Sequence, residues 1–131
     1  MLDDEAHIQE LVVRGLRERG YETRAVSQVP DALRLLGWPP SRSGPGRWKP
    51  DLLIVDWKMP GYDGTELLCL LRGDPRLVDL PVILLGQRSP LYDTARYLEA
   101  LPWRAQAYVY KPFSLLELLP VVQTLLARSS H

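Results

Sequence analysis

Residues 51–56 read Asp-Leu-Leu-Ile-Val-Asp, so that four apolar side chains stand between two carboxylates. An uninterrupted apolar run of this length is typical of a strand in a parallel sheet covered on both faces, because neither side of such a strand meets water. Residues 81–85, Pro-Val-Ile-Leu-Leu, repeat the pattern, and residues 107–110, Ala-Tyr-Val-Tyr, are a weaker version of it. These three segments predict the centre of a parallel sheet.

Segments with helical spacing alternate with the strands. Residues 7–19 carry apolar side chains at positions 8, 11, 12 and 16, which lie on one face of a helix, and Gly20 follows as a C-terminal stop. The mixed polarity of residues 21–26 is typical of a strand at a sheet edge. Further helices are predicted at 30–36, 64–72, 91–101 and 115–127, with a loop rich in Gly, Pro and Ser at 37–50. This alternation predicts an α/β fold with right-handed crossovers.

Two features depart from a regular fold of this kind. A buried apolar strand is expected just before Asp3, but only Met1 and Leu2 stand there. Two interpretations stay open, namely that the true start lies upstream or that the first strand is a stub. Pro120 lies inside the last predicted helix, where we expect a kink or the loss of the hydrogen bond to Leu116.

Length and composition exclude several classes of protein. The 131 residues match one domain, and no apolar run approaches the ~20 residues that a membrane span needs. No basic stretch precedes an apolar one at the N-terminus, and the single cysteine excludes an internal disulfide framework, so we expect a cytoplasmic protein. Lys plus Arg and Asp plus Glu number 16 each, which argues against binding of nucleic acid by this chain.

Charged residues stand where the predicted strands end. Asp3 and Asp4 follow the first strand, Asp56 follows the third, and Lys111 follows the fifth. Ligand sites of open parallel sheets form at these carboxyl ends, and three carboxylates there would repel one another unless a cation such as Mg²⁺ joined them. Each residue alone has an ordinary interpretation as a helix cap, a turn residue or a loop entry. Together they predict a phosphoryl-transfer arrangement of two metal-binding carboxylates, a nucleophilic carboxylate and a lysine.

At these positions the sequence resembles the receiver-domain family of bacterial two-component response regulators. Residues 56–64, Asp-Trp-Lys-Met-Pro-Gly-Tyr-Asp-Gly, are similar to the family's phosphoacceptor segment, and single-domain chemotaxis regulators also have Asp-Trp there. Residues 111–113, Lys-Pro-Phe, resemble the end of its fifth strand, residues 3–5 its acidic pair, and residues 81–83 the start of its fourth strand. The resemblance covers residues 2–127. It implies a flavodoxin-like, doubly wound parallel sheet of five strands in the order 2-1-3-4-5, with a receiver domain at 1–127 and a short tail at 128–131.

The resemblance also implies a role for each residue of the site. Asp56 would accept the phosphoryl group, and Lys111 would contact it. Asp4, Asp56 and the backbone carbonyl of Lys58 would bind Mg²⁺ directly, with Asp3 acting through water. Tyr108 would be the aromatic residue that rotates inward on activation.

The family's biology implies partners as well. The phosphoryl donor would be a sensor histidine kinase or a phosphotransfer protein, and the output would pass to a downstream protein effector, with a homodimer formed through the last helices and strand. The domain would assist its own phosphoryl transfer and hydrolysis without being a conventional enzyme. A phosphoryl group adds roughly −1.5 to −2 of charge, which suits a switch of a protein-interaction surface.

Some departures from the family favour an alternative. The switch Thr or Ser at the end of the fourth strand is replaced by Gly86, which has no hydroxyl. The loop at 37–50 and the region 101–106 are longer than usual. The alternative hypothesis is therefore a pseudo-receiver, a protein-binding module with impaired switching. A flavin-binding protein of the same topology fits less well, because an acidic cleft would repel an anionic cofactor.

Overall fold

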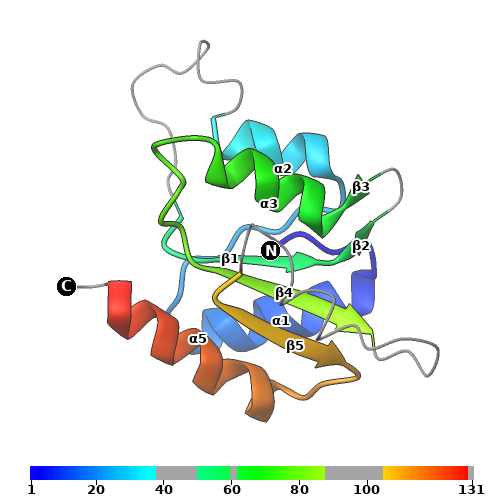
Figure 1. Cartoon of the computed structure of the whole chain (residues 1–131). Coiled ribbons are helices and arrows are strands. Elements are labelled where there is room, and N and C mark those ends of the chain that lie inside the picture. The colour runs from blue at the N-terminus through cyan, green and yellow to red at the C-terminus, as the bar shows by residue number, and fades with distance from the viewer. Residues whose placement is uncertain (38–49, 60–61, 88–104, 130–131) are drawn as a thin grey trace.

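The computed structural model of the chain describes residues 1–37, 50–59, 62–87 and 105–129. The predicted helix at 91–101 lies outside this part, as do residues 38–49 and 101–104 of the two long connections. Figure 1 shows the described helices and strands, which are α1 (Ala6–Glu18), α2 (Val29–Leu35), β1 (Leu53–Asp56), β2 (Lys58–Met59), β3 (Tyr62–Asp63), α3 (Gly64–Arg72), β4 (Val82–Gln87), β5 (Ala107–Lys111) and α5 (Leu115–Ser129).

The centre of the molecule is a parallel sheet in the order β1-β4-β5. Val55 of β1 pairs with Leu84 of β4, which pairs in turn with Tyr108 of β5. All four residues of β1 are buried. The prediction of three parallel strands is therefore confirmed. The short antiparallel pair of β2 and β3, which follows β1, was not predicted.

Leu2 alone occupies the place of a strand in the sheet, beside β1. It makes parallel bridges to Val26 on one side and to Val55 on the other. Its N–H donates to the carbonyl of Ile54 at 2.8 Å, and its carbonyl accepts the N–H of Asp56 at 2.8 Å. The segments thus follow the predicted order 2-1-3-4-5, with Leu2 in place of a longer first strand. Of the strand predicted at 21–26, only Val26 forms a β-bridge among the described residues. Its partner is Leu2.

Helices cover both faces of the sheet, with α2 and α3 on one face and α1 and α5 on the other (Figure 1). The side chains of successive strand residues point to opposite faces. Val55 and Leu84 therefore pack in a cluster with α2 and α3, whereas Ile54 and Ile83 pack with α1 and α5. This two-sided burial is the physical reason why β1 is apolar at every position between its flanking carboxylates.

The contact between α1 and α5 depends on a small residue. A Cβ atom added to Gly15 of α1 would lie 2.7 Å from Cδ1 of Leu115, the first residue of α5. Helix α5 continues through Pro120 to Ser129. Since proline has no N–H, the carbonyl of Leu116 lacks its helical donor, as predicted. The carbonyl of Pro120 itself accepts the hydroxyl of Thr124 at 2.9 Å.

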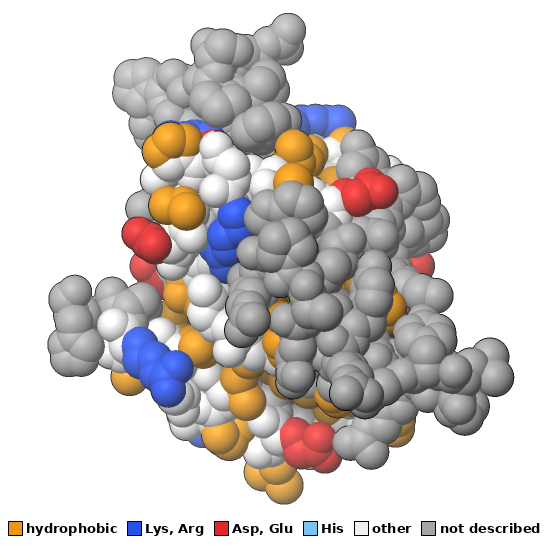
Figure 2. All heavy atoms as spheres, in the orientation of Figure 1, with side chains coloured by type: hydrophobic (Ala, Val, Ile, Leu, Met, Phe, Trp, Pro, Cys, Tyr) orange, Lys and Arg blue, Asp and Glu red, His pale blue; other side chains and the backbone are white. Residues whose placement is uncertain are grey.

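On the face in Figure 2, the coloured basic and acidic side chains are scattered and form no extended patch of one sign. Within the described ranges, no helix combines the length and the apolar character that crossing a bilayer requires.

Candidate functional site: an acidic cluster around Lys111

The ammonium group of Lys111 lies among three carboxylates at the carboxyl edge of the sheet. Its Nζ atom lies 2.9 Å from Oε1 of Glu5, 3.0 Å from Oδ2 of Asp3 and 3.4 Å from Oδ2 of Asp56. Asp56 is the last residue of β1 and Lys111 the last of β5, while Asp3 follows Leu2 and Glu5 immediately precedes α1. The relative exposures of Asp3, Asp56 and Lys111 are 0%, 6% and 9%. The topology therefore gathers these groups from three separate parts of the sequence.

Electrostatics keep Lys111 charged in spite of its burial. Burial alone lowers the pKa of this ammonium group, because desolvation disfavours the charged form. The hydrogen bonds to Glu5 and Asp3, together with the charges of Asp56 and Asp3, outweigh that effect and raise the pKa to about 12. The same hydrogen bond to Lys111 lowers the pKa of Glu5. At neutral pH the site therefore contains a permanent positive charge.

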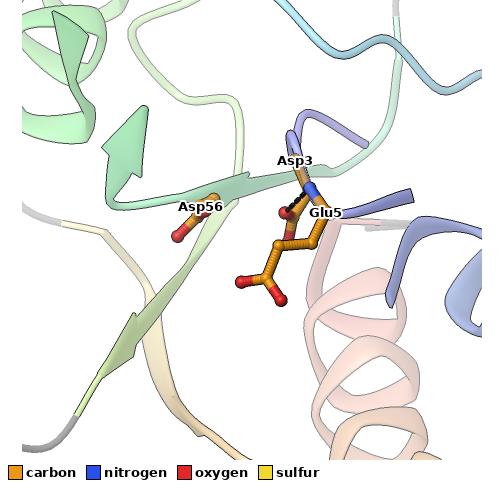
Figure 3. Close-up of side chains that lie close together, drawn as sticks. All are labelled: Asp3, Glu5 and Asp56. Carbon is orange, nitrogen blue, oxygen red and sulfur yellow. Dashed lines mark hydrogen bonds between the residues drawn. The ribbon is translucent and has the colours of Figure 1, made fainter. Parts of the chain in front are cut away.

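Asp3 fixes the position of Glu5. Its Oδ1 atom accepts the backbone N–H of Glu5 at 2.9 Å, drawn as a dashed line in Figure 3, while Oδ2 faces Lys111. Gln9 of α1 adds hydrogen bonds from Nε2 to the carbonyls of Asp3 and Val26, at 3.2 and 2.8 Å. Glu5 has the extended backbone of an N-cap residue, but its side chain makes no capping hydrogen bond. The carboxylate of Glu5 is thus directed to Lys111 instead of to the start of the helix.

The carboxylates of Asp3, Glu5 and Asp56 meet the first requirement of a cation site. Each offers one oxygen, and these three oxygens lie within 4.8 Å of one another. Figure 3 shows the carboxylates of Glu5 and Asp56 on the same side of the end of β1. Carboxylate oxygens are the ligands that Mg²⁺ prefers, usually one or two of them with water completing an octahedron. The donor set therefore suits a hard divalent cation.

The structure brings some of the predicted site residues together and leaves others apart. Asp3, Asp56 and Lys111 come together, whereas Asp4 is exposed and lies outside the group of three carboxylates within the described residues. Lys58 belongs to β2, where it pairs with Asp63. The direct metal-binding roles of Asp4 and of the Lys58 carbonyl stay predictions. Sequence reasoning missed Glu5, although its place as the third acid in an unbroken acidic run was a signal that could have included it.

The two predicted switch positions lie on neighbouring strands. Gly86 of β4 pairs with Tyr110 of β5, and a Cβ atom at position 86 would lie 3.7 Å from the ring of Tyr110, which is an ordinary contact distance. Tyr108 is half-buried and packs against the cluster that contains Leu84. The surroundings of Gly86 thus leave room for a Cβ atom.

A parallel sheet with an acidic cluster and a lysine at its carboxyl edge is the arrangement that the resemblance to receiver domains implied. Residues 1–123 match the sequence profile of the response regulator receiver domain. The chain therefore belongs to the receiver-domain family of two-component response regulators. The family proposed from the sequence and its flavodoxin-like fold are confirmed.

Curated relatives include transcriptional regulators of greater length. The phosphate regulon transcriptional regulatory protein PhoB of Klebsiella pneumoniae is 32% identical over 130 residues, which are 99% of this chain and 52% of that protein. The transcriptional regulatory protein PrrA of Mycobacterium leprae is 33% identical over 128 residues, 98% of this chain and 49% of that protein. The chain thus spans about half the length of these relatives.

Solved structures agree with the assignment. The receiver domain of a signal transduction histidine kinase from Syntrophus aciditrophicus has a TM-score of 0.78 and 32% identity, covering 96% of this chain and 86% of that chain. The receiver domain of the Francisella response regulator 1452 has a TM-score of 0.77 and 30% identity, covering 98% and 94%.

Proposed function

We propose that this receiver domain accepts a phosphoryl group on Asp56 in a Mg²⁺-dependent reaction and thereby switches a protein-interaction surface. The observation that carries the proposal is the contact of Lys111 Nζ with Oδ2 of Asp56 at 3.4 Å inside the acidic cluster. A buried ammonium group beside a buried carboxylate is suited to meet the charge of an incoming phosphoryl group. The donor is a phosphohistidine on a sensor kinase or a phosphotransfer protein.

In the reaction, an oxygen of Asp56 attacks the phosphorus atom, and the new O–P bond forms as the N–P bond to the donor imidazole breaks. The imidazole leaves with the electron pair and takes up a proton. Lys111 contacts the phosphoryl oxygens and neutralises part of their charge, while Asp3 holds Lys111 from the other side. Asp56 and Asp3, with Asp4 and the Lys58 carbonyl as further candidates, would hold Mg²⁺, which would supply charge neutralisation and orientation for the phosphoryl group.

The output is a changed surface for a protein effector or for a second copy of the domain, since phosphorylation adds charge and hydrogen-bond acceptors at one edge of the sheet. We assign no nucleic-acid contact to this chain itself. Reversal occurs when water hydrolyses the acyl phosphate, which returns Asp56 to the free carboxylate.

Gly86 supports the alternative of a pseudo-receiver that binds partners without switching. Glycine has no hydroxyl to bind a phosphoryl oxygen. The link that the family makes between the phosphoacceptor and the switch aromatic residue, here Asp56 and Tyr108, therefore lacks its hydroxyl. In this alternative the acidic cluster around Lys111 is structural.

Phosphorylation from a small donor tests the proposal. The protein is incubated with Mg²⁺ and acetyl phosphate, and intact mass is recorded for wild type, Asp56→Asn and Asp51→Asn. Asp51 is an exposed carboxylate just before the same strand, so Asp51→Asn removes an equal charge away from the cluster. We expect wild type and Asp51→Asn, but not Asp56→Asn, to gain one phosphoryl group. Absence of any gain in wild type, together with absence of Mg²⁺ binding, would establish the pseudo-receiver instead.

A further inference from the structure

Gln9 of α1 joins three parts of the chain through its side-chain amide. Its Nε2 atom donates to the carbonyl of Val26 at 2.8 Å and to the carbonyl of Asp3 at 3.2 Å. Carbonyl oxygens only accept hydrogen bonds, so both hydrogens of the amide are used. The side chain therefore ties α1 to the segment that follows Leu2 and to the segment on the other side of Leu2 from β1.

These bonds lie where the sheet hydrogen bonds of the first segment end. Leu2 is the residue of that segment that forms β-bridges within the described ranges. The N–H of Asp3 still donates to the carbonyl of Val26, but at 3.3 Å, which exceeds the usual length of about 2.9–3.0 Å. A longer strand would be held in place by its own ladder of hydrogen bonds. Here a side chain from α1 supplies the restraint that such a ladder would give.

Gln9 contacts the acidic run 3–5 at both ends. Its backbone N–H donates to the carbonyl of Glu5 at 3.0 Å, while its side chain donates to the carbonyl of Asp3. Because a peptide unit is planar, holding the carbonyl of Asp3 also fixes the direction in which the chain continues to Asp4. Asp4 is exposed as a result, whereas Asp3 and Glu5 face the ammonium group of the site.

We propose that Gln9 is a positioning residue of the phosphoryl-transfer site, which sets the backbone of residues 3–5 and so decides which of the three acids face Lys111. The part of the inference that concerns phosphoryl transfer rests on the proposed function. Gln9 acts through the backbone, because its amide donates to carbonyls and not to carboxylates. The effect passes through Asp3, which binds the N–H of Glu5 with one carboxylate oxygen and faces Lys111 with the other.

Nuclear magnetic resonance tests the positioning without a cation or a phosphodonor. Gln9→Met keeps the approximate length of the side chain and removes both donors, and Gln123→Met makes the same change at an exposed glutamine of α5. The reporter is the backbone N–H of Glu5, which Asp3 binds at 2.9 Å. We expect its resonance to move and its exchange with solvent to become several-fold faster in Gln9→Met, with neither change in Gln123→Met.

Two further measurements ask whether this positioning matters for the site. Isothermal calorimetry gives the Kd for Mg²⁺, and time courses of intact mass with acetyl phosphate give the rate constant for phosphorylation of Asp56. Loss of a group that orients a metal ligand from outside typically costs about 10–100-fold in metal affinity or activity. We expect Gln9→Met to raise the Kd and to lower the rate constant by roughly 10-fold each, and Gln123→Met to leave both unchanged. A merely structural role would lower the stability of Gln9→Met but leave both values of the folded protein as in wild type.

Gln9→Asn decides the matter if circular dichroism shows that Gln9→Met is unfolded. Its amide is one methylene group nearer to the backbone, so it cannot reach the carbonyls of Asp3 and Val26 together at their present distances. We expect the Glu5 resonance to move in this variant as well, and the Kd and the rate constant to depart from wild type in the same directions. A folded Gln9→Asn that matches wild type in all three measurements would contradict the inference.

The remaining outcomes separate the inference from the proposed function. If wild type binds Mg²⁺ and is phosphorylated, but the Glu5 N–H, the Kd and the rate constant of folded Gln9→Met equal those of wild type, the inference alone is wrong. It is also wrong if the Glu5 N–H changes while the Kd and the rate constant do not. If wild type neither binds Mg²⁺ nor accepts a phosphoryl group, the proposed function fails, and the role of Gln9 in phosphoryl transfer fails with it.

Discussion

Replacement of Lys111 by methionine is expected to lower the free energy of unfolding at pH 7 by about 2–4 kcal/mol in the absence of divalent cations. Methionine is close to lysine in length and keeps the apolar contacts of the stem. It removes the ammonium group that lies within 4 Å of all three carboxylates of the cluster. Asp3 and Asp56 then lose the ammonium group that faces both of their carboxylates.

The magnitude follows from two considerations. The rise in the pKa of Lys111 from 10.5 to about 12 corresponds to about 2 kcal/mol, at 1.36 kcal/mol per pKa unit. Removal of one partner from a buried ion pair typically costs about 3–5 kcal/mol, because the remaining charge stays desolvated. Glu5 is half-exposed and can turn toward water, which places the expected loss toward the lower part of that range.

Urea unfolding followed by circular dichroism, with EDTA present, measures the loss. The control is Arg14→Met, since Arg14 pairs with Glu10 at 3.7 Å on the exposed side of α1 and the two side chains are 71% and 75% exposed. Exposed pairs contribute about 0–1 kcal/mol, so this variant should unfold close to wild type. A Lys111→Met variant within about 0.5 kcal/mol of wild type would show that the carboxylates do not depend on the lysine, and the electrostatic account of the site would be refuted.

Three further outcomes are expected. Because the pKa of Lys111 is raised above its ordinary value of 10.5, its stabilising contribution is fully present below pH 10.5 and is lost as the pH rises through about 12. The difference in unfolding free energy between wild type and Lys111→Met should therefore shrink over that interval. A constant difference would contradict the raised pKa of Lys111. Gly86→Thr should fold and change stability by no more than about 1 kcal/mol, because its Cβ would meet the ring of Tyr110 at an ordinary 3.7 Å; a larger loss in urea unfolding would show that the site is tighter than the backbone indicates. Arg72→Met should lose about 2 kcal/mol in the same assay, because Arg72 donates to three carbonyls of the loop after α3 and to Oε1 of Gln106; an unchanged midpoint would mean that water replaces these bonds.

The parts of the fold that followed from the sequence are those in which burial dictates the residue type. Strand β1 lies between two helical layers, so each of its positions between Asp51 and Asp56 had to be apolar, and the run was visible without any other information. Helix α3 was predicted with its observed bounds, 64–72. By contrast, the strand predicted at 21–26 is represented by Val26 alone, since pairing depends on the partner strand and not on the segment's own composition.

The site was predicted in part for a similar reason. Asp56 and Lys111 stand at strand ends, and the topology of a parallel sheet requires such ends to meet. Which acid of the run 3–5 faces the cluster is decided by the backbone between Leu2 and α1, where Asp3 binds the N–H of Glu5. The conformation of that segment depends on this hydrogen bond, which the order of residues alone does not specify. Asp4 and Glu5 were therefore not distinguishable by sequence pattern.

Glu5 and Lys111, which share a hydrogen bond, are separated by 106 positions along the chain. A polypeptide emerging from the ribosome therefore has Asp56 long before it has the lysine and the fifth strand that hold the ammonium group beside it. Until the last third of the chain has been synthesised and has docked, the ammonium group of Lys111 is not beside Asp56. The acidic cluster around Lys111 is therefore complete only after β5 has been made and has paired with β4.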